Sequence, residues 1–595
     1  MAAHVQWTGR PASKEHEHPY RAPPAPSNPV VRGLPLYYGA KIITSSTLIQ
    51  NLLWGNAGFD SLRNRAELEG VEPRYEPLVV KSSGTRVSTA EALQTLSNED
   101  WTSRTPSEKL YPGILDYHEA YKTGRTTPTA VAKVLLPLVR RDVEIPSKHS
   151  VAFLSSKVDL VMRAAEASTK RYEEGKSLGP LDGVPVAVKD EEDVTGYPKC
   201  VGSKLDLKDK HDATSYCVQA WQDAGAVLIG KTNMHEYGMD TTNNNPNHGT
   251  PLNPHNNTYY CGGSSGGSAY AVGAGLVPVA IGNDGGGSIR IPSAYCGLYG
   301  LKPSHGRVSI RPTSNLARSN GVAGPLAANM VDLEISYRVM AQPDLEEPNS
   351  ALFDTPSSAA STHGRKKVLG IFIEWFDRAD PAVQQACMNV VDYLTSKLDY
   401  EIVDISIPML HEGQTAHAMT ILCEIPSGVS SLKNLTPANQ VLMSVGSKTP
   451  GVDFLQAQKM RMLLMQHLAH LYEKHPGMII VTPTTPNAGW NFDPQDLKYG
   501  CSNGNMSLRS MEYVWLANFT GCPAISVPAA YLEPEKGTGR IPIGFMGMGE
   551  WCSEDELLAF GYDCERYLHD VYENGRVKPA TYVEVLEAAT TQAEP

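Results

Sequence analysis

Residues 261–292 read CGGSSGGSAYAVGAGLVPVAIGNDGGGSIRIP, and this stretch contains two glycine-rich turns. The first turn carries Ser264 and the second carries Ser288. Residues 269–281, between the turns, are apolar, whereas flexible Gly/Ser linkers normally lack apolar residues. We therefore place both turns in the core of a folded domain.

The second turn has the composition that an acyl-transfer site needs. A serine hydroxyl attacks a carbonyl group only if one group accepts its proton and others stabilise the oxyanion. The run from Gly285 to Gly287 lets backbone N–H groups converge beside Ser288. Lys189 ends the apolar segment 183–189, where burial disfavours the ammonium form and favours a base. A surface lysine at a strand end fits the same pattern equally well, so this reasoning alone leaves the base open.

Short motifs elsewhere point to other chemistries without the context that those chemistries need. Residues 225–232, GAVLIGKT, match a phosphate loop, but a helix precedes them and 226–229 form an apolar strand, which reverses the required order. Residues 262–266 match the nucleophile elbow G-x-S-x-G, but the Asn- and Pro-rich segment before them does not resemble a strand. Neither His235-Glu236 nor His411-Glu412 continues into H-E-x-x-H, so a zinc hydrolase lacks its ligands.

Composition excludes several classes of protein. The chain has 595 residues, 41% hydrophobic and 19% charged, which is the globular norm. Its formal net charge of −12 argues against nucleic acid as a partner. Ten cysteines without a C-x-x-C pair indicate reduced thiols, and no apolar run reaches membrane-spanning length. These features predict a cytoplasmic protein without a transmembrane segment.

The organisation of the chain predicts an α/β fold preceded by an extension. Helical and strand-like patterns alternate from about residue 111 onwards, as in α/β proteins. The first 29 residues are rich in Pro and His and cannot bury enough apolar surface to offset the entropy of ordering. We therefore expect a flexible tail over residues 1–29, an accessory extension over 30–110 and the main domain over 111–590.

The sequence strongly resembles the amidase signature family of Ser-Ser-Lys amide hydrolases. The resemblance covers about residues 111–583 and is densest over 261–305. Blocks resembling the family also occur, in the family's order, at 179–190, 230–236, 482–486 and 518–528. The resemblance implies one large α/β domain with a twisted mixed sheet covered by helices on both faces.

The resemblance also implies a role for each matching residue. Ser288 would be the nucleophile, Ser264 a bridging serine with a cis peptide, and Lys189 the base. Gly285 stands where the family commonly has Ile or a similar residue, so the width of the pocket is expected to differ. The backbone amides of the oxyanion hole would come from Gly285, Gly286, Gly287 and Ser288, and Ser265, Asp284 and Arg290 would be supporting polar residues, with no metal and no cofactor.

We expect hydrolysis of a small-molecule carboxylic amide through an acyl-enzyme. The apolar composition of 411–441 and 487–511 favours an apolar or aryl acyl group. A glutamine-hydrolysing component of an amidotransferase, of the A type, is the main alternative. A catalytically silent scaffold is less favoured because all three catalytic positions are occupied. A homodimer is compatible with the sequence.

Overall fold

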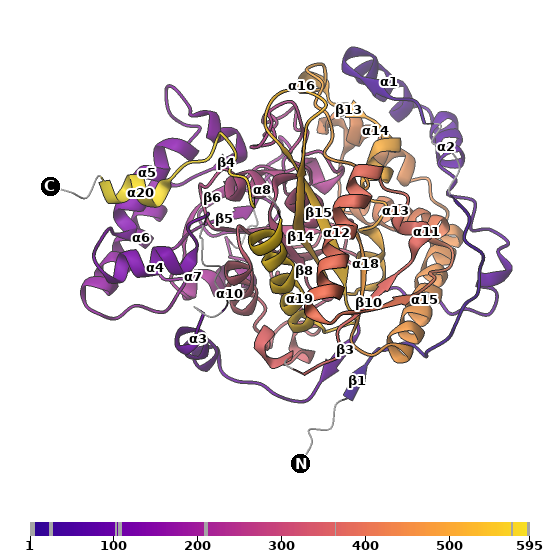
Figure 1. The fold of residues 1–595 in the computed structure, drawn as a ribbon. Coiled ribbons are helices and arrows are strands. Elements are labelled where there is room, and N and C mark those ends of the chain that lie inside the picture. Colours follow the sequence, from indigo (N-terminus) through magenta and orange to yellow (C-terminus); the bar gives the residue numbers. More distant parts are fainter. Residues whose placement is uncertain are drawn as a thin grey trace.

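In the computed structural model, eleven strands form one mixed sheet through the centre of the molecule (Figure 1). The structure describes residues 6–22, 28–101, 104, 110–207, 212–362, 364–572 and 575–591. Both outer portions contain parallel pairs, and antiparallel pairs join them through the middle. From edge to edge the strands are β11 (Glu401–Asp404), β10 (Val368–Ile371), β12 (Met478–Pro483), β15 (Ile541–Met548), β14 (Ala524–Leu532), β8 (Tyr299–Lys302), β9 (Val322–Ala327), β7 (Val279–Asp284), β5 (Pro185–Lys189), β6 (Val227–Thr232) and β4 (Phe153–Ser155).

Helices cover both faces of this sheet, and β8 shows why. Successive strand residues point to opposite faces. A Cβ added to Gly300 would meet Ser293 of α9 (Arg290–Cys296), so Gly300 faces this helix. The neighbouring Tyr299 points to the opposite face, where its ring lies under the guanidinium of Arg576. The helices on that face are α10 (Met330–Met340) and α19 (Glu554–Arg566). A glycine thus lets α9 approach the strand closely. The predicted α/β fold with a mixed sheet is confirmed.

Further helices surround this centre (Figure 1). Their apolar residues join a continuous core that includes the fully buried Trp221, Trp375, Trp515 and Trp551. Within the described part of the chain, no helix combines the length and apolarity needed to span a bilayer. The helices are α4 (Ile114–Lys122), α5 (Pro128–Val139), α6 (Val158–Glu173), α7 (Tyr216–Asp223), α8 (Gly266–Gly273), α12 (Pro381–Leu398), α13 (Leu410–Ser427), α14 (Pro437–Gly446), α15 (Gly451–Lys474), α17 (Gly504–Ser510), α18 (Trp515–Thr520) and α20 (Val585–Thr591).

Residues 225–232, the apparent phosphate loop, form no phosphate cradle. Val227–Thr232 is β6, a fully buried strand paired with β5 on one side and β4 on the other. The backbone amides of this segment therefore belong to the sheet. The prediction of a strand at this position is confirmed.

The N-terminal region lies against the main body. Residues 1–5 and 23–27 of the predicted flexible tail lie outside the described residues. In the described part, β1 (Gln6–Thr8) pairs with β3 (Val80–Ser82), and the backbone N–H of His16 donates to His467 at 3.2 Å. Residues of the 6–22 segment thus make backbone and side-chain contacts with elements far along the chain. The flexibility of the tail stays a prediction.

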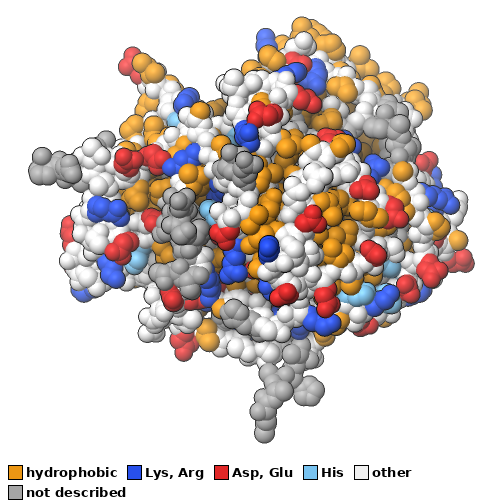
Figure 2. Space-filling model, viewed as in Figure 1, with side chains coloured by type: hydrophobic (Ala, Val, Ile, Leu, Met, Phe, Trp, Pro, Cys, Tyr) orange, Lys and Arg blue, Asp and Glu red, His pale blue; other side chains and the backbone are white. Residues whose placement is uncertain are grey.

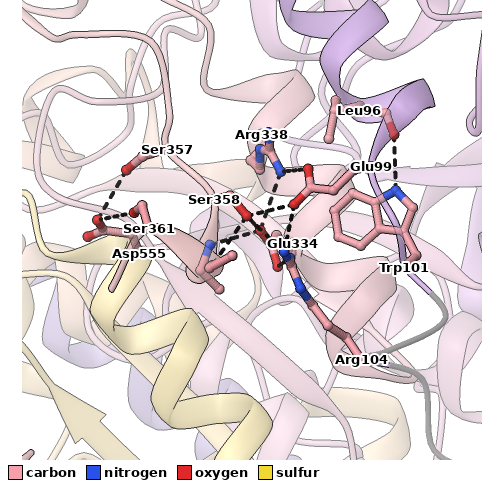
Figure 3. A network of polar contacts seen from close by, with 12 residues as sticks. Leu96, Glu99, Trp101, Arg104, Glu334, Arg338, Ser357, Ser358, Ser361 and Asp555 are labelled. Atoms are coloured by element: carbon pink, nitrogen blue, oxygen red, sulfur yellow. Dashed lines mark hydrogen bonds and ion pairs between the residues drawn. The ribbon is translucent and has the colours of Figure 1, made fainter. Parts of the chain in front are cut away.

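The accessory segment contains α1 (Gly33–Ser45), α2 (Thr47–Asn56) and α3 (Thr89–Asn98). Figure 3 shows polar contacts that tie it to α10. The carboxylate of Glu99 forms ion pairs with Arg338 of α10 at 2.5 Å and with Arg104 at 2.8 Å. Arg104 also forms an ion pair with Glu334 of α10 at 3.2 Å. At the far end of the segment, α1 and α2 expose apolar side chains at the upper right of Figure 2. The boundary at residue 110 stays a prediction.

Candidate active site

The sheet brings the two serine turns and Lys189 to one place. β5 and β7 are parallel neighbours, so their carboxyl ends lie at the same edge. Lys189 is the last residue of β5, and Asp284 is the last residue of β7. Ser264 lies just before α8, which packs on both strands, and Ser288 lies between β7 and α9. Residues far apart in sequence therefore converge at one edge.

Lys189 and Ser264 are in direct contact. Lys189 Nζ lies 2.9 Å from Ser264 Oγ, and each residue is 1% exposed. The peptide bond between Gly263 and Ser264 is cis, as the resemblance implied. The ammonium group also lies 3.0 Å from a carboxylate oxygen of Glu191 and 3.3 Å from the carbonyl oxygen of Asn283. A buried amine and a serine hydroxyl are thus placed for proton exchange.

Ser288 lies at the more accessible end of this arrangement. It is half-buried, whereas Lys189 and Ser264 are buried. Its carbonyl oxygen accepts the N–H of Ser265 at 3.3 Å, which fixes the second turn against the first. The Ser265 hydroxyl in turn donates to the Asn283 carbonyl at 3.2 Å. Of the three side chains, that of Ser288 is therefore the most open to solvent.

A buried ion pair lies next to the second turn. Asp284 and Arg290 are both fully buried, and two guanidinium nitrogens lie 3.0 and 3.1 Å from the two carboxylate oxygens. Burial alone would raise the pKa of Asp284, but the charge and hydrogen bonds of Arg290 outweigh it and hold that pKa well below its usual range. Asn518 accepts from Arg290 at 2.6 Å. The carboxylate is thus fixed in its charged form.

The same carboxylate uses one of the amides expected in the oxyanion hole. The Gly287 N–H donates to Asp284 Oδ1 at 2.7 Å. This bond occupies the N–H of Gly287, one of the four predicted donors. Sequence could not show this, since Asp284 folds back onto the turn that follows it.

Two side chains set the orientation of the peptide groups that remain. His417 Nε2 donates to the Gly285 carbonyl at 2.8 Å, and Asn518 donates to the Asp284 carbonyl at 2.7 Å. Across a planar trans peptide the N–H points opposite to the C=O, so the N–H groups of Gly285 and Gly286 point away from Asn518 and His417. Burial lowers the pKa of His417 to about 4, so its ring is neutral at physiological pH.

Sequence reasoning missed Glu191, His417 and Asn518. Asn518 lies in the block 518–528, one of those that resemble the family, so the sequence marked the segment but assigned no role to this residue. Glu191 belongs to the acidic run 190–193, an unusual charge density directly after a buried strand. For His417 no local signal exists, because it comes from α13, more than a hundred residues after the turn it contacts.

Apolar side chains gather on one side of the serine turns. Tyr237 and its neighbours form a separate cluster with residues of α13 and α14. Gly238 lies close to Ser264, since a Cβ added there would be 3.5 Å from the hydroxyl, and a Cβ at Gly285 would be 3.9 Å from Ala317. The cluster thus borders the site. Its buried members are Val201, Met234, Tyr237, Met239, Ala317, Ile425, Leu435 and Met443.

Comparisons with known proteins point to one family. The amidase family model matches residues 141–558. The chain is 33% identical over 496 residues to a fatty acid amide hydrolase of Medicago truncatula, covering 80% of this chain and 79% of that protein. It is 38% identical over 442 residues to a component of the glutamyl-tRNA(Gln) amidotransferase of Chloroflexus aurantiacus, covering 69% and 88%.

A solved amidase structure has 26% identity and a TM-score of 0.65, covering 76% of this chain and 98% of that one. The match therefore extends from sequence to fold. The chain belongs to the amidase family and is an enzyme that hydrolyses the C–N bond of carboxylic amides.

Proposed function

We propose that this amidase acts through an acyl-enzyme on Ser288, with Ser264 as the proton relay and Lys189 as the base. The observation that carries the proposal is the 2.9 Å contact between the buried Lys189 amine and the Ser264 hydroxyl, directly beside the Ser288 turn. A serine nucleophile needs a base within hydrogen-bond reach, directly or through one intermediate.

Neutral Lys189 accepts the proton of Ser264 while Ser264 accepts that of Ser288, and Ser288 Oγ bonds to the amide carbon. The tetrahedral intermediate collapses when the proton returns through Ser264 to the leaving nitrogen, which departs as ammonia or an amine. Water then attacks the acyl-enzyme by the same relay and releases the acid.

The N–H groups of Gly285, Gly286 and Ser288 are our proposed oxyanion donors. The carbonyl contacts of His417 and Asn518 support Gly285 and Gly286, because they fix the two peptide planes. Ser265, Asp284 and Arg290 are proposed to hold the turns rather than to touch the substrate. Pre-oriented amides stabilise negative charge that develops during the reaction.

For the substrate we propose an amide with a long apolar acyl chain. The apolar cluster beside the serine turns supports an apolar acyl group. The fatty acid amide hydrolases of Medicago truncatula and Arabidopsis thaliana match 80% and 88% of the chain, and this supports a long acyl chain. The small residue at Gly285 leaves space beside the proposed scissile carbonyl.

The amidotransferase function is the competing candidate. The relative from Chloroflexus aurantiacus has the higher identity, 38%, but its match spans 69% of the chain. The matches to fatty acid amide hydrolases extend over a larger share of the chain. This favours a stand-alone hydrolase.

The proposal also covers the domain boundaries, the location and the oligomeric state. We keep residues 111–590 as the catalytic domain, 30–110 as an accessory segment and 1–29 as a separate N-terminal segment. A cytoplasmic location is also proposed, since the cysteines suit reducing surroundings. We also propose a homodimer. Light scattering tests this, because a homodimer gives twice the mass of one chain.

The decisive experiment combines labelling with a substrate panel. A fluorophosphonate probe followed by peptide mapping is expected to modify Ser288 alone, and Ser288→Ala is expected to lose the label. A panel of short aliphatic, aryl and long-chain amides, with glutamine and ATP-dependent transamidation included, is expected to favour long-chain amides. Labelling at another residue overturns the proposed nucleophile, and glutamine as the only good substrate overturns the stand-alone function.

A further inference from the structure

The surroundings of Lys189 suit an ammonium group better than the neutral amine that catalysis needs. An ammonium has three N–H donors. Three acceptors lie around Nζ: the Ser264 hydroxyl at 2.9 Å, a Glu191 carboxylate oxygen at 3.0 Å and the Asn283 carbonyl at 3.3 Å. With all three filled, Ser264 accepts a hydrogen bond from the lysine and cannot give it a proton.

Glu191 is the anionic member of this set. It is 6% exposed, and Lys189 is 1% exposed, so the two charges interact with little screening by solvent. A general base must lose its proton before it can act. The neighbouring carboxylate opposes that loss because it stabilises the positive charge.

The other acids of the run have different partners. Asp190 lies 2.9 Å from Lys231, and Asp193 lies 2.8 Å from Lys199. Glu192 accepts from the Asn283 side chain at 2.6 Å, and its second carboxylate oxygen is buried without a hydrogen-bond partner in the described structure. Among the four acids, Glu191 is thus the one in contact with Lys189.

We propose that Glu191 is a positioning residue that holds Lys189 in its charged form at low pH and thereby sets the pH above which the amidase becomes active. This inference rests on the proposed role of Lys189 as the base. It adds a residue whose charge limits the reaction at low pH and opposes formation of the neutral amine.

Other titratable groups also lie around Lys189. His235 and Asp240 follow β6; burial lowers the pKa of His235, so its ring is neutral at physiological pH. Burial raises the pKa of Glu192, and Lys199 partly counters this effect. The Asp190–Lys231 and Asp284–Arg290 pairs carry compensated charges. Glu191 therefore has the largest expected effect.

The test is the pH dependence of kcat/KM for Glu191→Gln, measured with an uncharged long-chain amide. Gln keeps the size of the side chain and an oxygen acceptor but removes the charge. At low pH, kcat/KM is expected to rise with pH as Lys189 loses its proton, and we call this part of the curve the rising limb. An opposite charge at this range shifts a titration by about 1 to 3 pH units. In Glu191→Gln the rising limb is therefore expected to move to lower pH by that amount. The position of the limb is the readout, since a purely structural role would change only the height of the curve.

Two further variants make the test specific. Glu192→Gln removes the charge of the adjacent buried acid and keeps an acceptor for Asn283, so its limb is expected to move by less than half as much. Glu191→Asp keeps the charge on a shorter arm, so its limb is expected to lie between those of the wild type and Glu191→Gln. If Glu191→Gln does not fold, the intermediate shift of Glu191→Asp carries the test.

Two outcomes overturn the inference: an unchanged limb in both Glu191 variants, or a limb that moves to higher pH. The second outcome would mean that Glu191 accepts the proton from Lys189 instead of opposing its loss. Failure of the proposed function is recognised separately, since Lys189→Ala would then retain the rising limb and the fluorophosphonate label would fall outside Ser288.

Discussion

The ends of β5 and β7 lie side by side, and each buries a cation against a carboxylate, yet the two pairs differ in geometry. At β7, Arg290 contacts Asp284 through two nitrogens, and the carboxylate also receives the Gly287 amide. At β5, Lys189 contacts Glu191 through a single nitrogen and shares that nitrogen with the Ser264 hydroxyl.

The difference separates a structural ion pair from one that must give up a proton. Arginine stays charged and its planar fork matches a carboxylate, so the β7 pair is permanent. A lysine amine can become neutral, so the β5 pair can be broken and re-formed during turnover. Substitutions at the two ends are therefore expected to affect different properties.

Lys189→Ala is expected to have the largest effect on activity. Loss of the proposed base should lower kcat/KM by about 10⁴-fold or more, and Ser264→Ala should be similarly impaired, because members of a relay act as a unit. The double variant should be little worse than either single one. Lys189→Arg should not restore activity, since guanidinium stays protonated. Turnover close to wild type in Lys189→Ala would place the base elsewhere.

Asp284→Ala is expected to affect stability first. Removing one partner of a buried pair leaves an uncompensated charge and costs about 3 to 5 kcal/mol, which urea unfolding would measure. The control is Asp142→Ala, whose side chain is 66% exposed beside Arg140 and whose loss should change the unfolding free energy by less than about 0.5 kcal/mol. Because the Asp284 pKa is depressed on folding, its contribution is present above the ordinary carboxyl range and is lost only in strong acid. Equal effects of the two substitutions would contradict this account.

His417→Ala tests whether the β7 turn must be held in place. Without the hydrogen bond to the Gly285 carbonyl, the 285–286 peptide can rotate, and misplacement of about 1 Å costs up to about 100-fold in rate. We expect kcat to fall by about 10- to 100-fold while KM changes little. His411, on the same helix and partly exposed, is the control. A normal kcat in His417→Ala would mean that other contacts hold the turn.

The smallest expected effects come from the glycines of the β7 turn. Gly287 has φ +103°, and a Cβ there would overlap Val514, so Gly287→Ala should destabilise the protein by about 1 to 3 kcal/mol. A Cβ at Gly285 would meet its nearest neighbour, Ala317, at an ordinary 3.9 Å. Gly285→Ala should therefore change stability by less than about 0.5 kcal/mol. Thermal unfolding of both variants makes the comparison, and equal shifts would contradict it.

Much of the fold could be predicted from the sequence because its signals are local. Apolar runs bounded by glycine and proline mark the buried strands, and the order of a helix before β6 removes the phosphate-loop interpretation. The N-terminal segment shows the limit of such reasoning: residues 6–22 contain few apolar residues, but β3 and α15 supply partners from far along the chain.

For the site, the sequence by itself determined that a glycine-rich turn carries Ser288, that Ser264 lies in a second turn, and that Lys189 ends an apolar segment. The tertiary structure alone decided that Lys189 contacts both Ser264 and Glu191, that Asp284 occupies the Gly287 amide, and that His417 and Asn518 orient the remaining peptides. Residue type and spacing fix local conformation, whereas hydrogen bonds and charge pairs depend on distances of about 3 Å that arise only when parallel strands and distant helices pack together.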